Sequence, residues 1–234
     1  MKLLMHVCCA PCSVYCIEEL RNEGIEPTLY WYNPNIHPYM EYKARRDCLK
    51  EYANIINVKA IFEEEYGLDS FCKNVISNLN SRCVNYCYPV RLKKTFEYAK
   101  KHGYDTVTTT LLYSIYQQHD YIKQLMEQYS KEYKIDFLYR DFRIGFWKGH
   151  QKAHDLGLYM QKYCGCIFSS EEKINSTNTT NKKSKLPKGF EFLPVKRNVN
   201  IKKEKDNKEQ YMDLLLEADP SENMINEYLQ DGDL

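Results

Sequence analysis

The residues with the most distinctive chemistry are the cysteines, of which the 234-residue chain contains 10. Seven of them lie in three tight clusters, namely Cys8, Cys9 and Cys12, then Cys83 and Cys87, and finally Cys164 and Cys166. Thiolates bind soft metal ions and iron–sulfur clusters, and paired thiols carry out redox chemistry. The clustered thiols outnumber the four ligands of one tetrahedral zinc ion, and neither of the two later pairs has the C-x2-C spacing of a zinc knuckle. The spacing predicts an iron–sulfur oxidoreductase with a four-iron cluster and, in addition, a second metal or a redox dithiol.

The first cluster lies where a predicted strand, residues 2–7, meets a predicted helix, residues 10–22. Successive side chains of a strand point to opposite faces, so Cys8 and Cys9 cannot easily both be core residues. The N-terminus of the following helix lowers thiol pKa values and favours thiolates. We expect both residues to be metal ligands and Cys9 to be catalytic as well, whereas Cys16, further along the helix, fits the core.

Strands and helices alternate along the part of the chain that carries these cysteines. The expected strands are residues 2–7, 26–32, 58–62, 106–112 and 135–139, and the expected helices are residues 10–22, 39–55, 68–79, 89–102 and 117–133. This alternation predicts an α/β, Rossmann-like fold with a mainly parallel sheet and helices on both faces. In such sheets a site forms beyond the carboxyl ends of the strands, where Cys8, Cys9, Asn33 and Asp141 all fall.

Several classes of function are disfavoured by the rest of the sequence. Neither G-x-x-x-x-G-K-[ST] nor G-x-G-x-x-G occurs, so the fold carries no ATP or NAD signature. Basic and acidic residues nearly balance in residues 1–172, so an RNA partner would have to bind a local patch of basic residues. The apolar run at residues 1–7 is far too short for a signal peptide or a membrane span. We therefore expect a cytoplasmic protein with reduced thiols and no membrane attachment.

The composition changes after the last cysteine pair and predicts three segments. Residues 1–172 form the cysteine-bearing domain, and residues 173–208 read as a low-complexity, basic and disordered linker. Residues 209–234 carry only acidic charges but have enough apolar residues for two short helices. The stretch 214–234 resembles the start of a GNAT-type acetyltransferase domain, truncated before any acetyl-CoA loop. A pair of amphipathic helices on a basic tether is the alternative.

Five motifs in the first segment together resemble one known family. They are LLMHVCCAPCS at the amino terminus, RCVNYCYPVRL at residues 82–92, TVTTTLLYSIYQ at residues 106–117, DFR at residues 141–143 and QKYCGCIFS at residues 161–169. In this order, over residues 1–172, they are similar to the QueH family of epoxyqueuosine reductases. One departure is Ile115, where the family often has proline after the serine.

The resemblance implies the last step of queuosine synthesis on tRNA. In this step the epoxide oxygen of epoxyqueuosine is removed from the wobble position without cobalamin. It also implies a HUP-type α/β fold and a [4Fe-4S] cluster beside a mononuclear metal ion, taken here as iron, with ferredoxin or flavodoxin as low-potential donor. Six cysteines match the family positions and Cys12 matches many members; the six are Cys8, Cys9, Cys83, Cys87, Cys164 and Cys166.

Residues outside the cysteines receive roles from this implied reaction. Asp141 is a candidate oxygen ligand or proton donor, while an ion pair with Arg143 is the alternative. Basic side chains suit tRNA phosphates and aromatic rings can stack on the modified base. The predicted tRNA-contacting residues are Arg82, Arg91, Arg143, Tyr86, Tyr113 and Tyr116.

Two other classes of protein fit part of the pattern. Sulfonucleotide reductases also resemble HUP folds, and they hold a four-iron cluster with adjacent cysteines plus a later pair. A thiol-dependent reductase of a nucleotide is therefore the alternative function. Their later pair is C-x2-C, unlike either pair here. A metal-storage module would need the thiols alone, without the TTLLYSIYQ and DFR motifs.

Overall fold

A computed structural model describes residues 1–180 of the chain. Its centre is a five-stranded parallel sheet in the order β3-β2-β1-β4-β5. The strands are β1 (Leu3–His6), β2 (Thr28–Trp31), β3 (Ala60–Phe62), β4 (Thr106–Thr109) and β5 (Asp136–Phe137). The helices are α1 (Ala10–Asn22), α2 (Tyr39–Ile55), α3 (Leu68–Val75), α4 (Tyr88–Lys101), α5 (His119–Tyr133), α6 (Phe146–Asp155) and α7 (Ile167–Thr180).

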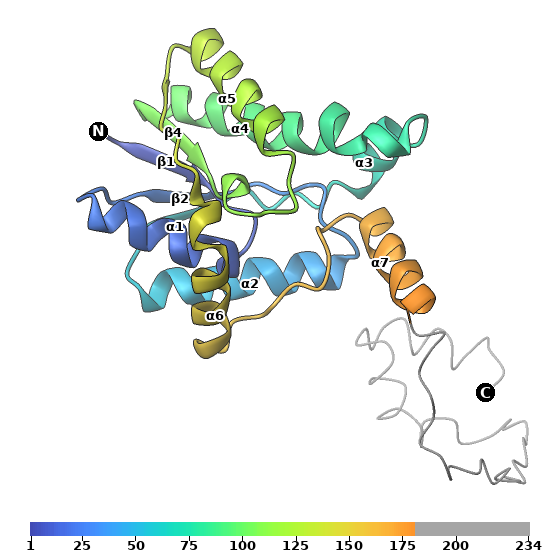
Figure 1. Cartoon of the computed structure of the whole chain (residues 1–234). Helices are drawn as coiled ribbons and strands as arrows, with labels where there is room; N and C mark the ends of the chain where they lie inside the picture. Colours follow the sequence, from blue (N-terminus) through green and yellow to red (C-terminus); the bar gives the residue numbers. More distant parts are fainter. Residues whose placement is uncertain (181–234) are drawn as a thin grey trace, which may run out of the picture. The chain divides into compact units, whose positions relative to one another are not determined.

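Helices cover both faces of the sheet, with α1, α2 and α6 on one side and α4 and α5 on the other (Figure 1). All residues of β1 and β4 are buried, as expected for central strands that are covered from both sides. The predicted α/β, Rossmann-like class is therefore confirmed. The strand order reverses between β1 and β4, and the ends of two such strands open a crevice at the carboxyl edge of the sheet.

Some boundaries differ from the sequence-based expectations. Helix α3 ends at Val75, and Cys83–Cys87 forms one π-helical turn leading into α4. The sequence analysis assigns no element to Phe146–Asp155, where the structure has α6. Helix α7 continues past residue 172 to Thr180.

The first part of the expected disordered linker 173–208, residues 173–180, is helical and belongs to α7. The rest of that linker and the expected helices at 209–234 lie outside the described residues, so these domain assignments stay predictions. None of the helices within residues 1–180 combines the length and the apolar character needed to span a membrane.

Candidate metal centre and substrate cavity

Three thiols converge at the corner between β1 and α1. The Sγ atoms of Cys8, Cys9 and Cys12, the first sulfur group, all lie within 4.8 Å of one another. The Cys8 and Cys9 Sγ atoms are 3.8 Å apart. Cys9 is the N-cap residue of α1, and its extended backbone turns the chain from strand to helix. Local backbone geometry therefore brings together three soft metal donors.

The protonation of this group is uneven. Hydrogen bonds from the thiols of Cys12 and Cys9 lower the pKa of Cys8 well below its usual value. The hydroxyl of Thr110, just beyond β4, also donates to Cys8 Sγ, at 3.6 Å. Burial raises the pKa of Cys9, which is only 1% exposed. Negative charge is thus best accommodated on Cys8, at the carboxyl edge of the sheet.

Four further thiols form the second sulfur group: Cys83, Cys87, Cys164 and Cys166. They line one cavity of about 200 Å³, although the two pairs come from segments far apart in the sequence. The Cys87 thiol hydrogen-bonds to Cys83 and lowers the pKa of Cys83 to about 6. Cys87 and Cys166 also pack against Phe71 of α3 in a small apolar cluster.

A buried arginine of α2 holds the second of these pairs in place. Arg45 is 2% exposed and donates from Nη1 to the Cys164 carbonyl at 3.0 Å and from Nη2 to the Tyr163 carbonyl at 2.9 Å. Its Nε donates to Glu41 Oε1 at 2.7 Å. The charge of Arg45 is therefore paired, and its remaining donors fix the backbone of the loop that carries Cys164.

The glycine between the two thiols completes this loop. Gly165 has a φ of +147°, which favours glycine, and an added Cβ would lie 3.3 Å from both Arg45 Nη1 and Ile36 Cγ1. The His37 N–H donates to the Gly165 carbonyl at 2.8 Å, and the Tyr163 hydroxyl donates to the His37 carbonyl at 2.6 Å. The turn after β2 and the start of α2 thus define the path of the Cys164–Cys166 loop.

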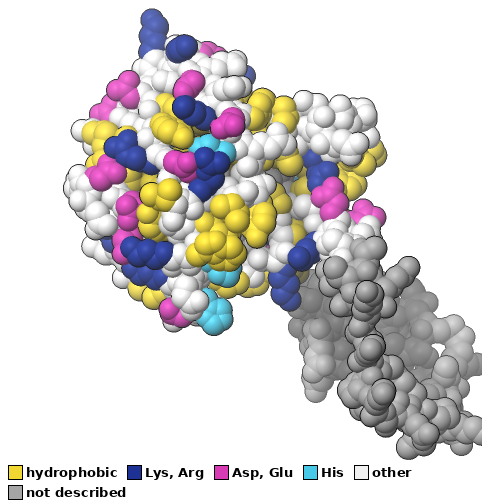
Figure 2. All heavy atoms as spheres, in the orientation of Figure 1, with side chains coloured by type: hydrophobic (Ala, Val, Ile, Leu, Met, Phe, Trp, Pro, Cys, Tyr) yellow, Lys and Arg dark blue, Asp and Glu magenta, His cyan; other side chains and the backbone are white. Residues whose placement is uncertain are grey.

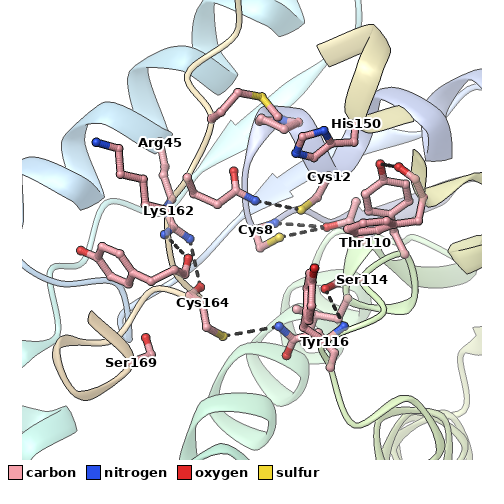
Figure 3. A pocket seen from close by; sticks show the side chains of 18 of the residues that line it. Cys8, Cys12, Arg45, Thr110, Ser114, Tyr116, His150, Lys162, Cys164 and Ser169 are labelled. Atoms are coloured by element: carbon pink, nitrogen blue, oxygen red, sulfur yellow. Dashed lines mark hydrogen bonds between the residues drawn. The ribbon is translucent and has the colours of Figure 1, made fainter. Parts of the chain in front are cut away.

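A larger cavity of about 590 Å³ lies against both sulfur groups. Cys8 and Cys12 form part of one wall and Cys164 lies across from them, with Tyr116 beside them (Figure 3). Gln117 donates from Nε2 to Cys164 Sγ at 3.4 Å. Because Cys164 and Gln117 line both cavities, the two cavities adjoin. The larger cavity falls in the range of small-molecule pockets, 300–1,000 Å³.

The three predicted tyrosines lie in different environments. Tyr116 is 77% exposed and lines both cavities. Tyr113 lines the larger cavity but is buried, and its hydroxyl donates to the Phe146 carbonyl at 2.7 Å. Tyr86 belongs to neither cavity lining of the described chain and hydrogen-bonds with Ser70 at 3.1 Å. Of the three, Tyr116 has the ring best exposed to a ligand.

The predicted arginines are mostly engaged within the protein. Arg82 and Arg91 are buried and line the smaller cavity, where Arg82 pairs with Glu172 at 2.6 Å and Arg91 donates to the Cys87 carbonyl. In this structure they supply positive charge beside the thiol of Cys83, whose pKa they help to lower, rather than at the solvent-facing surface. Their predicted contacts with tRNA phosphates stay predictions.

Asp141 and Arg143 pair with each other. The guanidinium of Arg143 donates to both carboxylate oxygens of Asp141, at 2.8 and 2.6 Å. These hydrogen bonds lower the pKa of Asp141 to about 2. Neither residue lines the two cavities found within residues 1–180. This geometry matches the ion-pair alternative, and a carboxylate held ionised in this way is a poor proton donor near neutral pH.

The donor set fits a thiolate-ligated metal centre. Six of the seven clustered thiols line two adjoining cavities, and Cys9 lies buried beside Cys8 and Cys12, the one trio of the described chain whose Sγ atoms are all within 4.8 Å of one another. Buried Arg82, Arg91 and Arg45 would offset the charge that several thiolates carry. Soft sulfur donors in this number suit iron–sulfur ligation better than a hard cation. The sequence analysis missed Arg45 because a basic residue in a helix rich in Glu, Lys and Arg reads as solvent-exposed.

Sequence comparison relates the chain to one family of known proteins. The family model described as "Epoxyqueuosine reductase QueH" matches residues 3–172. A protein of that name from Dehalococcoides mccartyi is 35% identical over 178 residues, covering 76% of this chain and 97% of the relative. One from Haemophilus influenzae is 33% identical and covers 72% and 71%, and one from Thermotoga maritima is 30% identical and covers 73% and 91%. Among solved structures, a predicted subunit of tRNA methyltransferase from Methanocaldococcus jannaschii has a TM-score of 0.43 at 14% identity, covering 77% of this chain and 88% of that chain.

Proposed function

The chain belongs to the epoxyqueuosine reductase QueH family, and on this basis we propose that it reduces the epoxide of epoxyqueuosine in tRNA to queuosine. The observation that carries the proposal is the match over residues 3–172, which includes all seven clustered cysteines. The overall change adds two electrons and two protons to the epoxide. Both C–O bonds of the epoxide break, a C=C bond forms, and the oxygen leaves as water.

The thiolates of the two sulfur groups would hold a [4Fe-4S] cluster and an adjacent mononuclear iron. When bound, these groups would supply electrons one at a time and a Lewis acid for the epoxide oxygen. Cys9 lies behind the wall formed by Cys8 and Cys12, so we assign it a role as a ligand rather than a contact to tRNA.

The chain's own residues would bind and shield the modified nucleoside. The cavity of about 590 Å³ admits it between Cys8 and Cys164, and the buried ring of Tyr113 closes part of the wall. Tyr116, exposed beside the same cavity, offers a face for stacking. A low-potential donor such as ferredoxin or flavodoxin would deliver the electrons, and a tRNA substrate would put the reaction in the cytoplasm.

The reaction is tested directly with the full chain, reconstituted with iron and sulfide under anaerobic conditions. Incubation with epoxyqueuosine-containing tRNA and a low-potential reductant should yield queuosine, read by mass spectrometry of the released nucleosides. Cys83→Ser should lose bound iron and product together, whereas Cys48→Ser should keep both, because Cys48 lines neither cavity in the described chain. An intact wild-type cluster that yields no queuosine would exclude the proposed reaction.

A further inference from the structure

An aromatic group forms one side of the larger cavity, where it opens to solvent. Phe146 is 8% exposed, and the rings of Tyr116 and Trp147 pack against it at 5.8 and 5.1 Å between centroids. The interplanar angles are 81° and 83°, so both rings stand edge-to-face with Phe146. His150, one turn further along α6, lies 6.4 Å from the Trp147 ring. All four residues line the cavity.

The two outer rings are unusually open to solvent. Trp147 is 70% exposed and Tyr116 is 77% exposed, whereas the other tryptophan, Trp31, is fully buried. Hydrophobic side chains gather over the start of α6 in the space-filling view (Figure 2). Exposure of a large indole at the opening of a cavity is costly unless a ligand covers it.

Helix α6 presents Trp147 from a rigid base. Gly149 lies so close to α1 that an added Cβ would stand 2.7 Å from Tyr15 Cβ and 2.6 Å from the Tyr113 hydroxyl. The hydrogen bond from Tyr113 to the Phe146 carbonyl fixes the same turn. The ring of Trp147 is therefore mounted on a closely packed helix, which reduces the entropy cost of ordering it on binding.

We propose that Trp147 is a stacking platform for the nucleotide next to the modified one, so that this base lies at the mouth while the modified nucleoside enters the cavity. The inference rests on the proposed function, because it takes the anticodon loop of tRNA as the ligand. Bases of a single-stranded loop are recognised largely by stacking on exposed aromatic rings. Lys162 is exposed, lines the same cavity and has no acidic partner within residues 1–180, so it is available to a phosphate of the bound loop.

The test measures RNA binding separately from turnover. The ligand is an anticodon-arm hairpin RNA without the modified nucleoside, carrying 2-aminopurine beside the wobble position. Trp147→Ala in the full chain should raise the Kd roughly tenfold, the effect of losing one stacked base, and should relieve the quenching of 2-aminopurine. Trp147→Phe should restore part of both signals, because a phenyl ring keeps a face for stacking.

Ile144→Ala is the matched control, because Ile144 is 85% exposed near the same turn and lies outside both described cavity linings. Its Kd should change by less than about twofold. Equal losses in the two variants, with a change in oligomeric state by light scattering, would instead identify the patch as a contact between copies of the chain. If the wild-type protein produces queuosine but Trp147→Ala binds the RNA with an unchanged Kd, the stacking role of Trp147 is overturned and the proposed reaction is not. If Trp147→Ala weakens RNA binding but the wild-type protein produces no queuosine, only the proposed reaction is overturned.

Discussion

The two sulfur groups are built in opposite ways. Cys8, Cys9 and Cys12 come from one strand-to-helix corner, and their convergence follows from the local backbone around the N-cap of α1. The second group joins the Cys83–Cys87 turn to the Cys164–Cys166 loop, which meet in the fold at the smaller cavity. The first group is therefore set by short-range geometry, and the second by contacts between distant segments.

This difference determines which substitutions should disturb each sulfur group. The first can be disturbed by changing its own residues or the two side chains that donate to its sulfur atoms, Thr110 to Cys8 Sγ and Gln161 to Cys12 Sγ. The second depends on side chains that hold no metal, above all Arg45, which hydrogen-bonds to the carbonyls of Tyr163 and Cys164. A substitution on α2, remote in sequence from either cysteine pair of the second group, should consequently affect that group while leaving all seven thiols in the chain.

The largest effect is expected from Arg45→Met. The substitution leaves buried Glu41 without its cation and removes two hydrogen bonds to the loop, so we expect a loss of about 3–5 kcal/mol in unfolding free energy. Urea unfolding of the apo-protein measures this loss, and iron per chain after reconstitution should fall with it. Arg46→Met is the matched control, because Arg46 forms its ion pairs at a partly exposed surface, and its loss should cost under about 1 kcal/mol. Similar losses in the two variants would contradict the special role of Arg45.

A smaller effect is expected from Gly165→Ala, which tests the loop itself. The backbone at φ +147° is strained for alanine, and the new Cβ would press on Arg45 and Ile36, so roughly 1–3 kcal/mol should be lost. Gly24→Ala has a φ of +74°, in the left-handed helical region, and open space around its Cβ, so it measures the cost of a positive φ without new contacts, and the loss at Gly165 should exceed it. The excess loss at Gly165 should be accompanied by faster alkylation of Cys164 and Cys166 in the apo-protein. Equal costs at the two glycines would show that the contacts with Arg45 contribute nothing.

The same distinction explains how far the sequence could predict the molecule. The bounds of α1 and α2 agree with residues 10–22 and 39–55, because helical periodicity is a local property. The cysteine spacing likewise indicates which residues could be ligands. It cannot show that Cys164 borders both cavities, since that depends on where the loop before α7 lies against α2.

Side chains that act through long-range packing were the least predictable. Arg45 lies in a helix with many charged residues, and its two carbonyl partners are 118 and 119 positions away. Trp147 follows a segment without a clear strand or helix pattern, and only the docking of α6 on α1 places its ring at the cavity. Asp141 shows the opposite error. Its position after β5 predicted a side chain in the crevice, but the carboxylate instead accepts a hydrogen bond from Arg143, two residues further along the chain.

The smallest effect is expected from Asp141→Asn, which tests whether the two sulfur groups form the metal centre without Asp141. Arg143 lowers the pKa of Asp141 from an ordinary 3.8 to about 2, so folding favours the ionised carboxylate. The resulting stabilisation is fully present above about pH 4 and is lost as the pH falls through about 2. Because the pair is partly exposed, with a side-chain exposure of 34% for Asp141, it should contribute under about 1 kcal/mol at pH 7.

The stability difference between wild type and Asp141→Asn in urea should therefore shrink in acid, and iron content at pH 7 should be unchanged. A loss of iron would identify Asp141 as a metal ligand. A tenfold loss of turnover with normal iron would show that Asp141 takes part in the reaction. Either result would show that the two sulfur groups are not sufficient for the metal centre and its reaction.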